Sequence, residues 1–271
     1  MLETSVLWLR IATFLYAIGL LHALIVALRR NSSVFPAAIL AFRIAVVLHA
    51  VSLVELGLLT GHIPADNVYE SLSLCAFLIA VAYLIVHQRY GLSSAGVAIF
   101  PLVFLMSQVG AMEIPVAGWT DLRVRQSWLL VHVLLILTGY AALLVTAIGS
   151  ILYLLQERRL KAKTSSSALD RLPPLATLDN LVTRAMGLGF VFITLGVIAG
   201  STWAFVESGT RWFGEAKIIL SLITWALCLA MIYLRAAAGW RGRRAAMMAL
   251  TVLGCNLLTW IAHVGMQPTL K

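Results

Sequence analysis

Residues 127–155 read SWLLVHVLLILTGYAALLVTAIGSILYLL and contain no Asp, Glu, Lys or Arg. A run of this length and composition is long enough to cross the hydrocarbon core of a bilayer, which takes roughly 20 mostly apolar residues. Similar runs recur along the whole chain. The eight predicted spans cover residues 7–28, 37–60, 70–88, 93–112, 127–155, 184–205, 217–236 and 245–266.

The composition is typical of an integral membrane protein. The 271 residues are 61% hydrophobic and only 11% charged, with a mean hydropathy of +0.96, far from the values of soluble globular domains. We therefore expect an all-α polytopic membrane protein, a bundle of about eight transmembrane helices forming one membrane domain over residues 1–271. The net charge of +9 does not indicate nucleic-acid binding, because the basic residues lie in short loops beside the spans.

The first span has no basic segment before it and no small-residue cleavage pattern after it, so we expect a retained helix and not a signal peptide. Basic residues mark the odd-numbered loops as cytoplasmic, which predicts that both termini face outward, to the periplasm. Residues 156–182 are predicted to form a cytoplasmic linker loop. The basic residues of the odd loops are Arg29, Arg30, Arg89, Arg158, Arg159, Lys161, Lys163, Arg171, Arg241, Arg243 and Arg244.

Several histidines fall within predicted spans, where each is expected to face a cavity, a partner or a ligand. His49 lies near the middle of the second span, whereas His132 and His263 lie on the outer side of the fifth and eighth. Two imidazoles on separate helices suit haem, whose axial ligands approach the iron from opposite faces. The alternative for each histidine is an interhelical hydrogen bond.

Two tryptophans flank a polar segment in the outward stretch GSTWAFVESGTRWFGEAK, residues 200–217. Trp203 and Trp212 are either interfacial anchors or aromatic faces that stack on a porphyrin. In the second interpretation, Arg211 or Lys217 pairs with the haem propionates.

Several motifs, taken in order, resemble the cytochrome c assembly protein family, which includes the CcsA and CcmC types. GHIPADNVYESLSL at residues 61–74 resembles the family's Gly-His-x-Pro and Asn-x-Tyr-Glu-Ser elements. LITWALCLAMIYLRAAAGWRGRRAA at residues 222–246 resembles the helix and basic loop that follow the family's tryptophan-rich segment. The resemblance covers roughly residues 40–266.

The resemblance implies that His132 and His263 ligate haem beside the tryptophan-rich loop and that His49 is an intramembrane haem histidine. The sequence differs from the family pattern at two places. The family's Trp-x-Trp-Asp-Pro-Lys reads Trp-Phe-Gly-Glu-Ala-Lys from Trp212 to Lys217, and Tyr233 stands where a second intramembrane histidine is expected. Tyr233 is then either a haem ligand or an interfacial anchor. This pattern is most similar to the HemX and YpjD side branch.

The expected function is that of a haem-binding integral protein of the cell inner membrane that assists cytochrome c assembly and is not itself an enzyme. The implied cofactor is a non-covalent b-type haem. The implied partners are membrane lipid and other assembly components or apocytochrome c, with no nucleic acid.

Two alternatives remain open from the sequence. One is a HemX-like regulatory or scaffolding protein of tetrapyrrole metabolism that does not deliver haem. The other is a small-molecule transporter, for which Arg10, Arg43 and Glu55 are the intramembrane charges; an ion pair between Arg10 and Glu55 is the simpler explanation of two of them.

Overall fold

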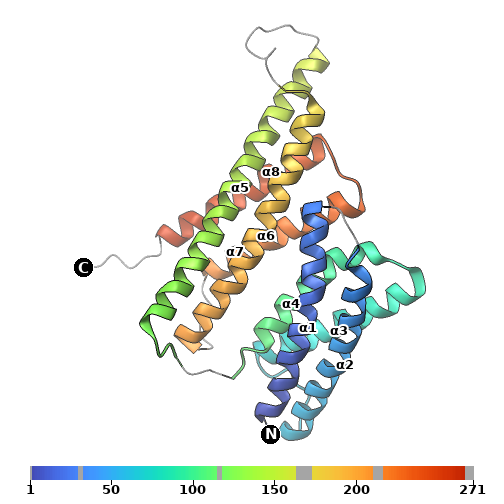
Figure 1. Ribbon diagram of the computed structural model, residues 1–271, viewed down its shortest axis with the longest axis vertical. Coiled ribbons are helices and arrows are strands. Elements are labelled where there is room, and N and C mark those ends of the chain that lie inside the picture. The colour runs from blue at the N-terminus through green and yellow to red at the C-terminus, as the bar shows by residue number, and fades with distance from the viewer. Residues whose placement is uncertain (1, 30–32, 115–117, 163–172, 210–215, 266–271) are drawn as a thin grey trace. The chain divides into compact units, whose positions relative to one another are not determined.

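The computed structural model describes residues 2–29, 33–114, 118–162, 173–209 and 216–265, and within these ranges it is all-α (Figure 1). Apolar residues dominate every long helix, as the sequence predicts. The helices are α1 (Leu2–Arg29), α2 (Phe35–Thr60), α3 (Val68–Tyr90), the short 3₁₀ helix η1 (Ser93–Ala95), α4 (Gly96–Gly110), α5 (Leu122–Ala162), α6 (Leu175–Ser208), α7 (Ala216–Ala237) and α8 (Arg243–Gly265).

The long helices correspond one by one to the eight predicted spans. Seven segments of the described chain are long and apolar enough to cross a bilayer, from α1 to α7 with η1 joined to α4. The eighth predicted span coincides with α8. The predicted linker at residues 156–182 is too long, because α5 continues to Ala162 and α6 already begins at Leu175.

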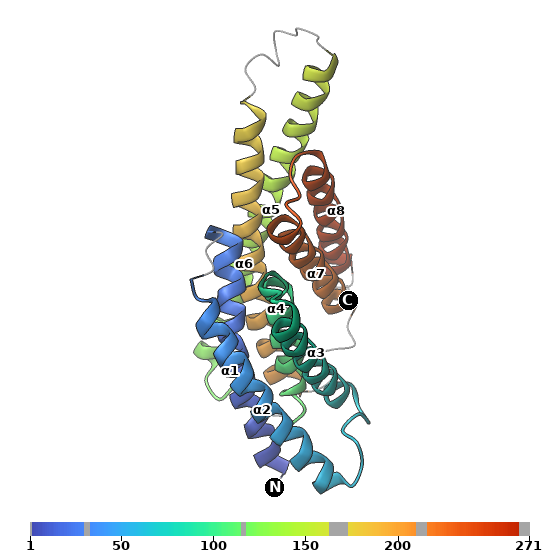
Figure 2. The ribbon, with the colours of Figure 1, turned by 90° about the vertical axis from the view of Figure 1, so that its right-hand side faces the viewer.

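The chain divides into two compact units, a division that the sequence does not indicate. Unit 1 comprises residues 1–122 and 201–211, and unit 2 comprises residues 123–200 and 212–271. In unit 1, α1 packs along α2 and against α4, and α3 packs along α4 (Figure 2). Three aromatic rings, Tyr16, Phe42 and Phe100, are fully buried where these helices meet.

Unit 2 is built on two long antiparallel helices, α5 and α6 (Figure 1). Their register follows from glycines that bring the backbones close together. A Cβ atom on Gly139 of α5 would lie 2.6 Å from Ile193, and one on Gly149 would lie 3.1 Å from Val182. Later residues of α5 therefore contact earlier residues of α6, as in an antiparallel pair. Small residues allow such close approach between membrane helices. The helix α7 packs beside α8.

Candidate functional site

His132 lies on α5 with its ring held against α6. Its Nδ1 is 2.8 Å from the backbone oxygen of Gly196. Because a carbonyl oxygen only accepts hydrogen bonds, Nδ1 carries the proton and donates it. In the neutral ring, Nε2 therefore has the lone pair that a metal requires. Histidines that ligate metals usually donate their other ring N–H to a carbonyl or carboxylate in this way.

The position of this ring depends on a stripe of residues along α5 that faces α6. Trp128, one helical turn before His132, donates from Nε1 to the oxygen of Ala199 at 2.8 Å. A Cβ atom on Gly200 would lie 2.4 Å from Cε1 of His132, so the ring occupies the space that a side chain at residue 200 would need. The polar face of α5 is thus fixed on a glycine-lined surface of α6, and the imidazole cannot take this position beside a larger residue.

His49 has a different environment, although the family resemblance implies a haem role for it as well. It is fully buried in unit 1, with Nε2 2.9 Å from Oγ of Ser73 and Nδ1 3.4 Å from the hydroxyl of Tyr16. The ring of Phe77 lies edge-on at a centroid distance of 5.6 Å. Both ring nitrogens are paired with protein hydroxyls, so in this arrangement neither has a lone pair directed at open space.

The other candidate residues are distributed over both units. Trp203, half-buried on α6, belongs to unit 1 together with His49, whereas Tyr233, half-buried on α7, belongs to unit 2 together with His132. His263 is part of α8, which is also assigned to unit 2, but its side chain lies outside the described residues. Trp212 and Arg211 also lie outside the described residues, as does the side chain of Lys217.

The charges that the transporter interpretation relies on do not form the expected ion pair. Arg10 and Glu55 are both described, and the ion pairs found in the described part of the chain do not join them. Arg10 and Arg43 are exposed, and Glu55 is half-buried. The predicted ion pair is therefore wrong.

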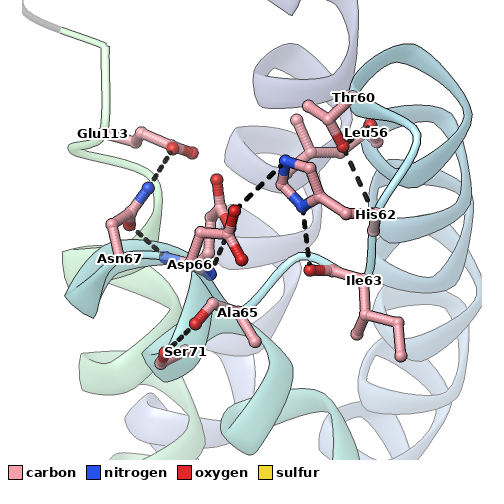
Figure 3. A network of polar contacts seen from close by, with 10 residues as sticks. Leu56, Thr60, His62, Ile63, Ala65, Asp66, Asn67, Ser71 and Glu113 are labelled. Atoms are coloured by element: carbon pink, nitrogen blue, oxygen red, sulfur yellow. Dashed lines mark hydrogen bonds and ion pairs between the residues drawn. The ribbon is translucent and has the colours of Figure 1, made fainter.

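The loop between α2 and α3 carries a polar network that the sequence singled out as a motif but gave no chemistry (Figure 3). Asn67 caps α3 by accepting from the N–H of Glu70 at 2.9 Å, and Glu70 accepts from the N–H of Asp66 at 2.9 Å. This reciprocal pairing resembles a capping box, which satisfies the free N–H groups at a helix start. The Asn-x-x-Glu spacing is the sequence signal that could have predicted it.

Three possible metal ligands, His62, Asp66 and Glu70, also meet in this loop, with ligand atoms within 4.8 Å of one another. Each already has a protein partner: His62 faces Asp66 at 3.4 Å, and Glu70 accepts the capping hydrogen bond. The His62 and Asp66 side chains are 42% and 67% exposed. These features favour a helix cap over a metal site.

Glu113 joins this network by accepting from Nδ2 of Asn67 at 2.9 Å. Burial raises the pKa of the Glu113 carboxyl; the hydrogen bond from Asn67 opposes this rise, and the nearby Glu70 adds to it. The start of α3 and the end of α4 are therefore linked by a carboxyl group that resists ionisation.

A buried ion pair in unit 2 was not predicted from the sequence. Arg235 on α7 is 6% exposed and lies 2.8 Å from Oδ2 of Asp179 on α6. The same guanidinium donates to the hydroxyl of Thr183 and, at 3.1 Å, to the backbone oxygen of Asp179. Oδ1 of Asp179 accepts from the N–H of Gly242 at 3.2 Å. These contacts fix the end of α7, and the turn that follows it, on the start of α6.

The fold and these sites define the class: an all-α, multi-pass membrane protein whose polar side chains join helices within the apolar segments. The family model described as cytochrome C assembly protein matches residues 65–267. The chain belongs to the cytochrome c assembly protein family.

Several similar proteins are named cytochrome c biogenesis protein CcsA. The protein of Prochlorococcus marinus strain MIT 9312 is 29% identical over 77% of this chain and 76% of its own length. That of strain MIT 9303 is 30% identical over 73% and 74%. The protein of Heterosigma akashiwo strain NIES-293 is 27% identical over 75% and 73%. No solved structure matches the chain.

Proposed function

We propose that this chain is a haem-handling protein of the cell inner membrane that works in cytochrome c biogenesis, with His132 as an axial ligand of a non-covalent b-type haem. The observation that carries the proposal is the hydrogen bond from Nδ1 of His132 to Gly196. It sets the plane of the ring and the tautomer in which Nε2 carries the lone pair, an arrangement usual for histidines that ligate metals.

The chain's own residues would bind and orient the group without reacting with it. Haem supplies the iron and the porphyrin that are delivered to an apocytochrome. His132 would ligate the iron, and His263, which the family resemblance assigns, would be the second ligand. The proposed role includes no catalytic acid, base or nucleophile, so we propose a binding protein and not an enzyme. Its partners would be other assembly components or apocytochrome c.

The test is the haem content of the purified full-length protein in detergent, measured as a pyridine haemochrome after expression with ample haem. We expect haem in the wild type and its loss in His132→Ala and His263→Ala. His62→Ala, which removes an exposed loop histidine, is the matched control and should keep its haem. Absence of haem from the wild type would overturn the proposal.

A second function, the accessory or regulatory role of the HemX kind, is favoured by one specific observation. Both ring nitrogens of His49 are engaged by Ser73 and Tyr16, which argues against an inner haem site at this residue. A protein that binds haem at one site without passing it across the membrane fits such an accessory role. Normal cytochrome c levels in a deletion strain, together with altered tetrapyrrole levels, would favour it.

A further inference from the structure

A groove lies beside the turn that joins α7 to α8 in unit 2. Its volume is about 420 Å³, and the residues that line it come from both helices and from the turn. They are Leu227, Trp240, Arg243, Arg244, Met247, Met248, Thr251 and Val252. The basic turn belongs to the GWRGRR motif at residues 239–244, to which the proposed haem function gives no role.

The lining is cationic at one end and apolar along the rest. Arg243 and Arg244 are exposed and form no ion pair with any other residue in the described ranges, and none of the eight lining residues is acidic. The acid next to the turn, Asp179, is already paired with Arg235 and with the N–H of Gly242. Two uncompensated positive charges therefore line the groove together with methionine, leucine and valine side chains.

Contacts within the protein hold the turn in this shape. Gly239 and Gly242 have φ angles of +66° and +64°, a region that side chains other than glycine rarely adopt. The N–H of Trp240 donates to the oxygen of Leu234 at 3.2 Å, which folds the turn back toward the end of α7. Because the turn is also bonded to α6 through Asp179, the groove is preorganised, and binding needs little further ordering.

We propose that this groove binds one anionic phospholipid, with the phosphate on Arg243 and Arg244 and an acyl chain along Leu227, Met247 and Val252. Trp240 would lie at the level of the headgroup, where indole rings are enriched. Basic pockets between membrane helices suit anionic headgroups, because charge attraction adds to burial of the chain. The inference needs the chain to span a membrane, but it does not depend on haem binding.

The test is native mass spectrometry of the full-length protein in a neutral detergent, titrated with dioleoyl-phosphatidylglycerol or, as the uncharged-headgroup comparison, dioleoyl-phosphatidylcholine. We expect one phosphatidylglycerol to bind in preference to phosphatidylcholine. The double variant Arg243→Gln/Arg244→Gln should weaken its binding by about tenfold or more. The matched control Arg89→Gln/Arg158→Gln removes the same charge at two exposed arginines outside the groove and should bind as the wild type does.

Equal losses in the two double variants would overturn the proposal, because they would indicate diffuse attraction and not a site. Equal binding of both lipids would overturn it as well. If instead haem content falls in Arg243→Gln/Arg244→Gln while phosphatidylglycerol binding does not, the groove serves haem carboxylates and the lipid assignment is wrong. Should the double variant fail to fold by circular dichroism, the single variants Arg243→Gln and Arg244→Gln, each expected to lose about threefold or more, decide the question.

Discussion

His132 and His49 are both imidazoles on apolar helices, but their hydrogen-bond partners differ in kind. A backbone carbonyl holds one nitrogen of His132 and fixes its tautomer, whereas two hydroxyls engage both nitrogens of His49. A carbonyl partner fixes which ring nitrogen carries the proton and orients the ring, as is usual for histidines that ligate metals. The two hydroxyl partners of His49 belong to Tyr16 on α1 and Ser73 on α3, so these hydrogen bonds help to join α1, α2 and α3.

The first prediction concerns His49 as a structural residue. His49→Ala should lower the free energy of unfolding by about 2–3 kcal/mol, because removing the buried imidazole leaves a cavity among packed side chains. Ser73→Ala removes only one interhelical hydrogen bond and should cost about 0.6 kcal/mol, a typical value within membranes. Thermal unfolding in detergent measures both, and both variants should keep the wild-type haem content. Loss of haem in His49→Ala without destabilisation would show that His49 is a ligand.

The second prediction tests whether Gly200 is needed to seat the His132 ring. In Gly200→Ala the new Cβ would meet the ring at 2.4 Å, so the ring must move and its bond to Gly196 is lost. We expect clearly weaker haem binding and a stability loss of about 1–3 kcal/mol, as for other overpacked sites. Gly254→Ala on α8, where no heavy atom lies within 4 Å of the new Cβ, is the control and should bind haem normally. Haem titration followed at the Soret band gives the comparison.

At the scale of elements, the helices of unit 2 are joined by two kinds of contact. Glycines bring α5 and α6 together, and a buried ion pair joins α6 to α7. The indole N–H of Trp225 on α7 also donates to Oγ1 of Thr194 on α6 at 3.0 Å. These polar contacts specify which helices are neighbours, a role that apolar surface cannot fill in a bilayer, because lipid tails compete for it.

A third prediction follows from the Arg235–Asp179 pair. Asp179→Ala leaves a buried guanidinium uncompensated and should destabilise the protein by about 3 kcal/mol or more. Arg235→Met with Asp179→Ala should recover much of that loss, because the uncompensated charge is then absent. A double-mutant cycle on apparent melting temperatures checks this. Equal stability of the single and double variants would contradict a charge-based explanation.

A fourth prediction concerns Glu113 at the end of α4. Its folded-state pKa lies above the ordinary value of 4.5, so ionisation is harder in the folded protein than in the unfolded chain. The resulting loss of stability is complete above the folded pKa and disappears as pH falls through it toward 4.5. Glu113→Gln, which still accepts from Asn67, should therefore be the more stable protein at pH 8 and lose this advantage by about pH 4.5. Melting curves across this range, with Glu3→Gln as the exposed control outside this network, measure the difference.

At the scale of the whole molecule, the eight helical segments could be predicted from the sequence, because apolar runs of spanning length are a direct signal. Their ends could not be, since α5 and α6 extend beyond the apolar core through residues such as Arg158 and Asp179 that hydropathy assigns to a loop. His132 could be singled out, but its pairing with Gly196 could not, because the register between α5 and α6 depends on Gly139 and Gly200 packing closely. The division into two units could not be predicted, because the amino-acid composition does not change between them in a way that indicates it.

Membership of the cytochrome c assembly family is consistent with haem handling, and we propose that His132 ligates the haem iron. The most direct measurement is chemical rescue: full-length His132→Ala is purified and then mixed with haem, and its Soret spectrum is recorded with and without added imidazole. We expect the variant to lack the wild-type spectrum and imidazole to restore it, while His49→Ala has the wild-type spectrum without imidazole. A His132→Ala protein with an unchanged haem spectrum would show that His132 does not ligate the iron.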